Sequence, residues 1–269
     1  LTQMTGEGKA YDTALAEAQA AGYAEADPTL DVTGGDSAHK LAILASLAFG
    51  CALTDGQIPC RGVDELALDD INFGAEMGYA IKLLAIAEQH EGGLALRIAP
   101  CFVDRDEQLA QVGGSFNALS IFGHAVGHTL YYGRGAGQMP TASAVVGDLL
   151  SIADGAYPAA FARLTMWPDQ HGPADLLDAD DVPARYYLRL NALDVPGVVA
   201  KFSQALGAEE ISIAAVLQHE VKAGQFVPVV IVTHQTTAGA VRRAAKRIAD
   251  LDVIDGEPVC IEIVDMPEG

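Results

Sequence analysis

The chain has 269 residues, half of them hydrophobic, and a formal net charge of −20. This length allows one large or two ordinary domains with real cores. Because a chain this acidic cannot neutralise a run of phosphates, we expect no nucleic-acid partner. The longest apolar run, from Leu41, is shorter than the roughly 18 residues that a membrane span needs, so no membrane partner is expected either.

The cysteines indicate the compartment. Their positions show no CxxC pair and no metal-type spacing: Cys51, Cys60, Cys101 and Cys260. Free thiols in a reducing environment are the natural interpretation, and no signal peptide is visible, so we expect a cytoplasmic protein. The chain starts without a methionine and enters a helical pattern at once. We interpret it as a fragment of a longer protein.

The first part of the chain predicts helices around an acidic loop. Residues 9–21 are rich in helix formers at helical spacing, and Gly22 is expected to end that helix. Residues 23–35 form the loop. Asp36 and Ser37 are suitable N-cap residues for the next helix. That helix is expected to run on through residues 39–53, and another from about Asp70 to His90.

The middle of the chain is less regular. Residues 93–105 form an apolar run that predicts a strand, and residues 116–132 predict strands with tight turns. Residues 133–155 predict a glycine-rich loop that leads into a helix of small residues. Residues 166–184 hold three prolines and five aspartates, a composition typical of a linker between domains.

The last part has the clearest pattern. Strand-like and helix-like segments alternate, and the first helix is opened by Pro196. In chain order the segments are strand 185–195, helix 196–210, strands 211–221 and 226–236, helix 237–251 and strand 258–265. The order β-α-β-β-α-β predicts a ferredoxin-like unit.

The segment 22–40, GYAEADPTLDVTGGDSAHK, gathers carboxylates around one lysine. Asp36 and Lys40 lie four residues apart at a helix start, so their side chains share one face. Alone, such a pair is an ordinary surface ion pair, worth well under about 1 kcal/mol. A carboxylate cluster beside a lysine can also bind a substrate ammonium and keep the lysine charged as a proton donor. The residues alone leave both interpretations open.

Three further motifs each allow a binding role, and an ordinary structural role is the alternative for each. GRGAGQMP, residues 133–140, can bring backbone amides to a phosphate, but Gln138 stands where GxGxxG needs a glycine, and a close-packed turn is the alternative. HAVGH, residues 124–128, lacks the glutamate of HExxH, so no metal site is expected. The turn LDVPGV, residues 193–198, opens a helix whose amides can bind a small carboxylate, unless it is simply a tight turn.

The acidic segment and the helix before it resemble the signature of homoserine dehydrogenases. That signature is alanine, three residues, Gly-Tyr-x-Glu-x-x-Pro, two residues, aspartate, then x-x-Gly-x-Asp-x-x-x-Lys. The sequence matches it in register at Ala18, Gly22, Tyr23, Glu25, Pro28, Asp31, Gly34, Asp36 and Lys40. HKLAILASLAFG, GYAIKLLAIAE and GRGAGQMPTASAVVGDLL resemble later parts of the same catalytic region. The final unit, with its LDVPGV turn, is similar to an ACT domain.

The resemblance implies an α+β fold class. Residues 1–165 would form a mixed-sheet substrate-binding and dimerisation domain with flanking helices. Residues 166–184 would be the linker, and residues 185–269 a ferredoxin-like βαββαβ ACT regulatory domain. The family's N-terminal Rossmann domain is not in this sequence, and we expect it upstream.

The resemblance also implies a reaction. Homoserine dehydrogenases transfer hydride reversibly between a nicotinamide cofactor, NADP or NAD, and C4 of L-homoserine or L-aspartate 4-semialdehyde, in threonine, methionine and isoleucine biosynthesis. Lys40 would then be the proton donor, and Asp36 would hold its ammonium group. Substrate contacts would come from Glu25, Asp31 and Tyr23.

Cofactor and effector contacts follow from the same resemblance. The Rossmann domain would bind most of the cofactor, and contacts from this chain would be made by Gly137, Gly135 and Thr141. An amino-acid effector such as threonine would bind near Asn191, Asp194 and Gly197. A different class of function stays open, in which the chain is an amino-acid-sensing or dimerising module without activity of its own. We expect a homo-oligomer, an active parent enzyme and an inactive isolated chain.

Overall fold

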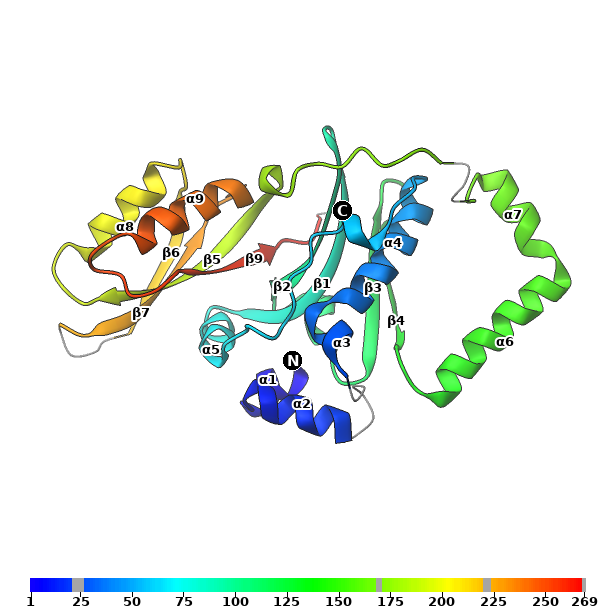
Figure 1. The fold of residues 1–269 in the computed structure, drawn as a ribbon, viewed down its shortest axis with the longest axis horizontal. Helices are drawn as coiled ribbons and strands as arrows, with labels where there is room; N and C mark the ends of the chain where they lie inside the picture. The colour runs from blue at the N-terminus through cyan, green and yellow to red at the C-terminus, as the bar shows by residue number, and fades with distance from the viewer. Residues whose placement is uncertain (21–26, 168–170, 220–223, 268–269) are drawn as a thin grey trace.

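A computed structural model describes residues 1–20, 27–167, 171–219 and 224–267 of the chain. A mixed sheet runs through the middle of the molecule, with its strands in the spatial order β1-β2-β9-β5-β7-β6 (Figure 1). The first two of these strands come from the first half of the chain and the others from its last third. The expected α+β class, with flanking helices and a terminal βαββαβ unit, is confirmed.

The two strands from the first half of the chain, β1 and β2, are longer than those from its last third. Their bounds are β1 Tyr79–His90, β2 Gly93–Asp104, β5 Pro183–Leu193, β6 Ile213–Gln218, β7 Phe226–Thr233 and β9 Val259–Val264, with the short β8, Thr236–Thr237, beside the start of β5. Single-turn 3-10 helices lie at Asp55–Gln57, Gln108–Gln111 and Ala179–Asp181.

The N-terminal helices α1 (Thr2–Glu7) and α2 (Tyr11–Ala20) lie at one edge of the molecule (Figure 1). The helix expected over residues 9–21 corresponds to α2, and Gly22, its expected end, lies outside the described residues. Met4 and Ala14 are buried in a cluster with residues of α5 and of the sheet. These helices therefore cover part of the sheet.

The helix expected from about Asp70 to His90 is wrong over most of its length. Helix α5 occupies only Leu68–Glu76, and Gly78, at φ 88°, separates it from β1. Although β1 is rich in helix formers, every one of its residues pairs in register with β2, from Tyr79 opposite Asp104 to the opposite end of the hairpin. That ladder satisfies the backbone, so tertiary pairing overrides local propensity.

The acidic loop is shorter than expected. It contains a helix of one turn and a half, α3 (Thr29–Thr33), followed directly by α4 (Gly35–Phe49). Gly34, at φ 87°, is the N-cap residue of α4. The expected capping by Asp36 or Ser37 is therefore wrong: the left-handed glycine lets the helix begin earlier, and both residues lie in its first turn.

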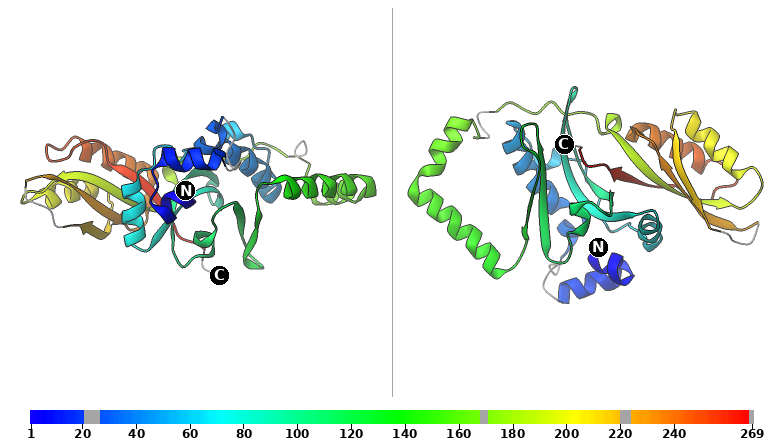
Figure 2. Two further views of the ribbon diagram at one scale, coloured as in Figure 1. Left: turned by 90° about the horizontal axis from the view of Figure 1, so that it is seen from below. Right: turned by 180° about the vertical axis from the view of Figure 1, so that it is seen from behind.

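Helix α4 packs on the sheet through small and branched apolar residues. Its Ala38, Leu41, Ala42 and Ala45 are buried in one cluster with Leu94, Leu96 and Ile98 of β2. The predicted strands and tight turns of residues 116–132 are confirmed by the hairpin β3 (Phe116–Gly123) and β4 (Gly127–Arg134). The helix predicted after the glycine-rich loop is α6 (Gln138–Asp154), and α7 (Ala156–Leu164) follows. Both helices lie at the end of the molecule opposite the C-terminal βαββαβ unit (Figure 2).

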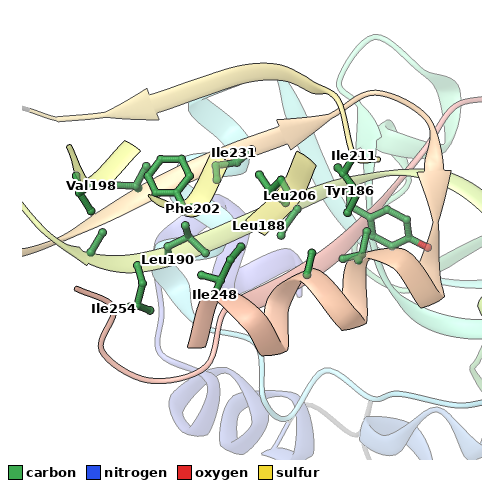
Figure 3. Packing of buried hydrophobic residues seen from close by; sticks show 14 of the residues in the cluster. Tyr186, Leu188, Leu190, Val198, Phe202, Leu206, Ile211, Ile231, Ile248 and Ile254 are labelled. Atoms are coloured by element: carbon green, nitrogen blue, oxygen red, sulfur yellow. The ribbon is translucent and has the colours of Figure 1, made fainter. Parts of the chain in front are cut away.

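The ferredoxin-like unit is confirmed. Its strands lie in the order β9-β5-β7-β6, and helices α8 (Val198–Gly207) and α9 (Ala238–Ala249) cover one face. Phe202, Leu206, Leu188 and Ile248 belong to one buried cluster between these helices and the strands, and Figure 3 shows their side chains gathered there. The other face packs on α5 and the N-terminal helices.

The two parts of the chain share their sheet, because β2 pairs in parallel with β9 at Cys101 opposite Glu262. The segment expected as a linker also contacts the first half. Leu94 donates its backbone N–H to Asp175 O at 2.8 Å, and Leu177 donates to Leu94 O at 3.0 Å. Across the described residues, no helix is both long and apolar enough to cross a bilayer.

Candidate active site

The first two turns of α4 carry the charged pair expected from the sequence. Lys40 Nζ donates to Asp36 Oδ2 at 2.6 Å, an i,i+4 contact along one helix face. The two side chains are 56% and 46% exposed. Their charges thus sit at an accessible surface, where a small polar molecule can reach them.

The other acidic residues lie just ahead of this pair in the chain. Asp31 is exposed on α3, and the left-handed Gly34 connects that helix to α4. Among the described residues, no hydrogen bond or ion pair joins Asp31 to Asp36 or Lys40. Glu25 and Tyr23, the other predicted substrate contacts, lie outside the described residues.

The glycine-rich loop stands apart from this group, at the start of α6 (Figure 1). Gly137 is the N-cap residue of α6 at φ 125°, a backbone conformation that favours glycine, and Thr141 lies exposed in the first turn with its N–H bonded to Gly137 O at 3.1 Å. Gly135 is different: a Cβ there would collide with the Asn117 side chain. A larger residue at position 135 would therefore require the exposed Asn117 side chain to shift.

The predicted effector residues meet at the junction of β5 and α8. Asn191 Nδ2 donates to Asp255 Oδ2 at 2.9 Å, and Gln218 Nε2 donates to Asp194 Oδ1 at 3.4 Å. Gly197 caps α8 at φ 90°. The structure therefore places all three near one turn, but Asn191 and Asp194 each already have a hydrogen-bond partner within the chain.

A hollow of about 400 Å³ lies at the far end of α4, lined by Phe49, Gly50 and Leu94 among others. Lys40 is near the opposite end of that helix. We therefore do not assign the hollow to the predicted site.

Sequence reasoning missed the support beneath the acidic turn. Cys60 Sγ donates to Thr33 O at 3.0 Å, and Val63 N donates to Val32 O at 2.8 Å, so the segment after α4 returns to hold the turn before it. Burial raises the pKa of the Cys60 thiol, which keeps it protonated as a donor. No periodicity could have revealed contacts between residues this far apart in the chain.

Two buried charge networks were missed as well. Arg97 donates to both carboxylate oxygens of Glu262 at 2.6–3.0 Å and to Glu88 at 2.7 Å. Asp70 is 1% exposed and accepts from Arg189 Nε at 2.6 Å and Tyr187 Oη at 3.0 Å. These networks connect the first half of the chain to β9 and β5.

Comparison with known proteins adds to this geometry. A family model described as homoserine dehydrogenase matches residues 1–150, which contain the charged pair and the glycine-rich loop. The chain belongs to the homoserine dehydrogenase family. An ACT domain model matches residues 186–250, which contain most of the ferredoxin-like unit.

Individual members of the family support the same assignment. The homoserine dehydrogenase of Pseudomonas aeruginosa is 39% identical over 98% of this chain and 62% of its own length, and that of Neisseria gonorrhoeae is 38% identical over 95% and 59%. A crystal structure of a homoserine dehydrogenase from Thiobacillus denitrificans matches with a TM-score of 0.90 and 40% identity, over 98% of this chain and 61% of that one. The Staphylococcus aureus enzyme matches with a TM-score of 0.73 and 28% identity, over 98% and 62%. The chain thus spans about three fifths of the length of these homoserine dehydrogenases.

Proposed function

We propose that the protein to which this chain belongs is an NAD(P)-dependent homoserine dehydrogenase. It interconverts L-homoserine and L-aspartate 4-semialdehyde in the cytoplasmic biosynthesis of threonine, methionine and isoleucine. The observation that carries this proposal is the Asp36–Lys40 contact at 2.6 Å across the first two turns of α4, inside a segment that matches the family. The proposed division of the chain is residues 1–165 for the substrate and dimerisation domain, 166–184 for the linker and 185–269 for the ACT domain.

Lys40 is proposed as the proton donor. When the aldehyde is reduced, its oxygen becomes an alkoxide, and an ammonium group within hydrogen-bond reach can protonate it or stabilise its charge. In the reverse direction the neutral amine takes the proton from the hydroxyl. Asp36 holds the ammonium in place, because its carboxylate accepts from Nζ one helical turn away.

The acidic residues before α4 are proposed to bind the substrate. L-homoserine and the semialdehyde both carry an α-ammonium, which Asp31 and Glu25 can bind through charge-assisted hydrogen bonds. Tyr23 would contribute a hydroxyl to the same end of the molecule. Asp31 is exposed on the helix that leads into the turn at Gly34, which supports its access to a ligand.

Gly137 and Thr141 are proposed to face the cofactor, with Gly135 as a neighbour. The residues present fit such a role: Gly137 has a conformation that favours glycine, and the first amides of a helix have no intrahelical partner and can donate to a bound acceptor. A bound nicotinamide would supply or accept the hydride. Most of its binding groups are expected in the part of the relatives that this chain does not span.

An amino acid such as L-threonine is proposed as the ligand of the ACT domain, at Asn191, Asp194 and Gly197. The match of residues 186–250 to the ACT domain supports this role, as does the glycine-capped start of α8, whose amides can bind a carboxylate.

Titration calorimetry of the protein with L-threonine tests the proposed effector site. Binding heat that is lost in Asp194→Ala but kept in Asp252→Ala would support an effector site, and absence of heat would leave dimerisation as the role of the domain. A homo-oligomer is proposed in either case.

The central test is an enzyme assay on the complete product of the gene. Reduction of NAD or NADP should depend on L-homoserine and should not be seen with L-serine, which lacks the C4 hydroxyl. Reduction of L-aspartate 4-semialdehyde should proceed with the reduced cofactor. Failure of the folded protein to turn over either substrate with either cofactor would disprove the proposed activity.

A further inference from the structure

A short segment, Pro59–Val63, lies between the sheet and the turn at the start of α4, the helix that carries Asp36 and Lys40. We call it the connecting segment. On one side it pairs with β2 in parallel. Ile98 N donates to Pro59 O at 2.9 Å, and Arg61 N donates to Ile98 O at 2.8 Å. The segment is therefore fixed to the sheet by its own backbone.

On its other side the connecting segment contacts the turn at residues 32–34. Val63 donates its N–H to Val32 O, and Cys60 Sγ donates to Thr33 O. The fit is close at Gly34, where an added Cβ would lie 2.7 Å from Cys60 Sγ and 3.1 Å from Ile98 Cγ2. The turn has no room to move toward the sheet.

Gly62 makes the closest approach. A Cβ at this position would overlap Val32 O and would lie 2.6 Å from Thr33 Cα. Its φ does not lie in the left-handed region, so the backbone itself would accept alanine. The two nearest atoms belong to the backbone of the turn, which leads directly into α4, and Asp64 Oδ1 would also lie 2.7 Å away.

Arg61 extends the connection to the ACT domain. Its Nη1 donates to Cys260 O at 3.0 Å, and Cys260 lies on β9 opposite Leu188 of β5. A strand of the ACT sheet is thus joined, through one arginine and one glycine, to the turn before Asp36 and Lys40.

We propose that Gly62 and Arg61 are positioning residues for the catalytic helix. Gly62 sets the distance between the connecting segment and the turn, and Arg61 anchors the segment to β9, so the place of Lys40 depends on the ACT sheet. This inference rests on the proposed function, because it assigns a purpose to the position of Lys40. Misplacing a catalytic group by about 1 Å can cost on the order of 100-fold in rate.

The first test compares two glycine substitutions in the complete gene product. Gly62→Ala should push the turn away and lower kcat for homoserine about tenfold or more, with KM changed less than about threefold, because Lys40 acts in the transition state. Gly56→Ala is the matched control: it lies in the same region, outside the left-handed conformation, with nothing within 4 Å of an added Cβ. Its kinetics should equal those of the wild type.

A second readout does not depend on activity. Ala38 N donates to Gly34 O at 3.0 Å in the first turn of α4, so its amide exchange reports on that turn. In Gly62→Ala this amide and that of Val63 should exchange about tenfold faster, while amides of α9 keep their wild-type rates. Uniformly faster exchange would indicate global destabilisation and contradict a positioning role.

The arginine supplies an independent variant should Gly62→Ala fail to fold. Arg61→Ala removes the anchor and should lower kcat and speed the exchange of Val63, whereas Arg61→Lys, which can still donate to Cys260 O, should restore part of both. Arg105→Ala is the control, since Arg105 also donates to a backbone carbonyl, Ala75 O at 3.0 Å, but away from α4. Wild-type kcat and exchange in both Gly62→Ala and Arg61→Ala would overturn the inference.

Failure of the inference is distinguishable from failure of the proposed function. A wild-type protein that does not oxidise homoserine refutes the activity, and the exchange measurements still decide whether the connecting segment holds the turn. If Lys40→Ala abolishes activity while the Gly62 and Arg61 variants behave as wild type, the activity stands and the positioning role is refuted.

Discussion

Helices α9 and α6 show how differently the two ends of the molecule are stabilised. In α9, Val241, Ala244 and Ile248 are buried against the strands of the ACT unit, and the charged residues face outward. In α6 none of the residues is buried, and Leu149 and Leu150 are 58% and 65% exposed. Both helices could be predicted from the sequence. An apolar helical pattern therefore predicts a helix, but it does not show that the chain itself supplies the surface that the helix packs on.

The largest expected effect is on catalysis, and it should be seen for a lysine of α4 but not for a comparable lysine of the ACT domain. Lys40→Ala should lower kcat of the complete gene product about 100-fold or more, because it removes the proposed proton donor. The unfolding temperature should stay unchanged, because the side chain is exposed. Lys201→Ala is the matched control, since Lys201 also forms an exposed ion pair, at 2.5 Å with Asp252, but in the ACT domain. Steady-state kinetics of both variants measure the difference. Equal kinetics for the two would contradict the assignment of catalysis to α4.

A second pair of variants tests the contrast in packing directly. Phe202→Ala should reduce the free energy of unfolding by about 3–5 kcal/mol, because Phe202 is fully buried in the core under α8 and α9. Leu149→Ala on α6 should change it by less than about 0.5 kcal/mol, because that side chain is already in solvent. Urea denaturation of the chain gives both values. A large loss for Leu149→Ala would show that α6 is packed in solution.

Breaking the charge network that joins the two parts of the chain should cost an amount of unfolding free energy between these two values. Asp70→Asn leaves the Arg189 guanidinium without its carboxylate in a largely buried site, at a cost of about 3 kcal/mol in unfolding free energy. The control is Asp265→Asn, which breaks a pair with Arg185 in which Asp265 is 62% exposed, and it should cost less than about 1 kcal/mol. If the two variants unfold at the same urea concentration, the Asp70 network does not hold the parts together.

The smallest expected effect is a pH dependence in the shared sheet. Burial raises the pKa of the Cys260 thiol on β9 from 9.0 to about 11. Because the folded pKa lies above the unfolded one, this thiol stabilises the fold fully below about pH 9, and its contribution is lost as the pH rises toward 11. The unfolding free energy of the wild type should therefore fall more between these pH values than that of Cys260→Ser. Equal slopes would mean that Cys260 does not keep its proton in the fold.

How much could be predicted from the sequence differs between the same two parts. The ACT unit could be predicted almost completely, since each of its strands and helices has a local pattern and Pro196 and Gly197 mark a helix start. Helix α5 and strand β1 were confused, because the alanines and leucines of β1 favour either state and only the pairing with β2 decides between them.

The site shows the same limit. The contact between Asp36 and Lys40 could be predicted because it depends on spacing within one helix. The capping of α4 by Gly34 could not, since it depends on a left-handed turn held by Cys60 and Gly62. Sequence reasoning thus identified the proposed catalytic pair, and missed the distant residues that contact the turn before it.

The location of β9 has a consequence for biosynthesis. This strand is the last of the described strands to be synthesised, yet its neighbours on the two sides are β2 and β5. While a ribosome is still translating residues before Val259, β2 and β5 lack their common partner. The edges that β9 later covers are then free to pair with other nascent chains. Termination of translation before Val259 would therefore remove a strand that both parts of the protein share, and would not affect the last unit alone.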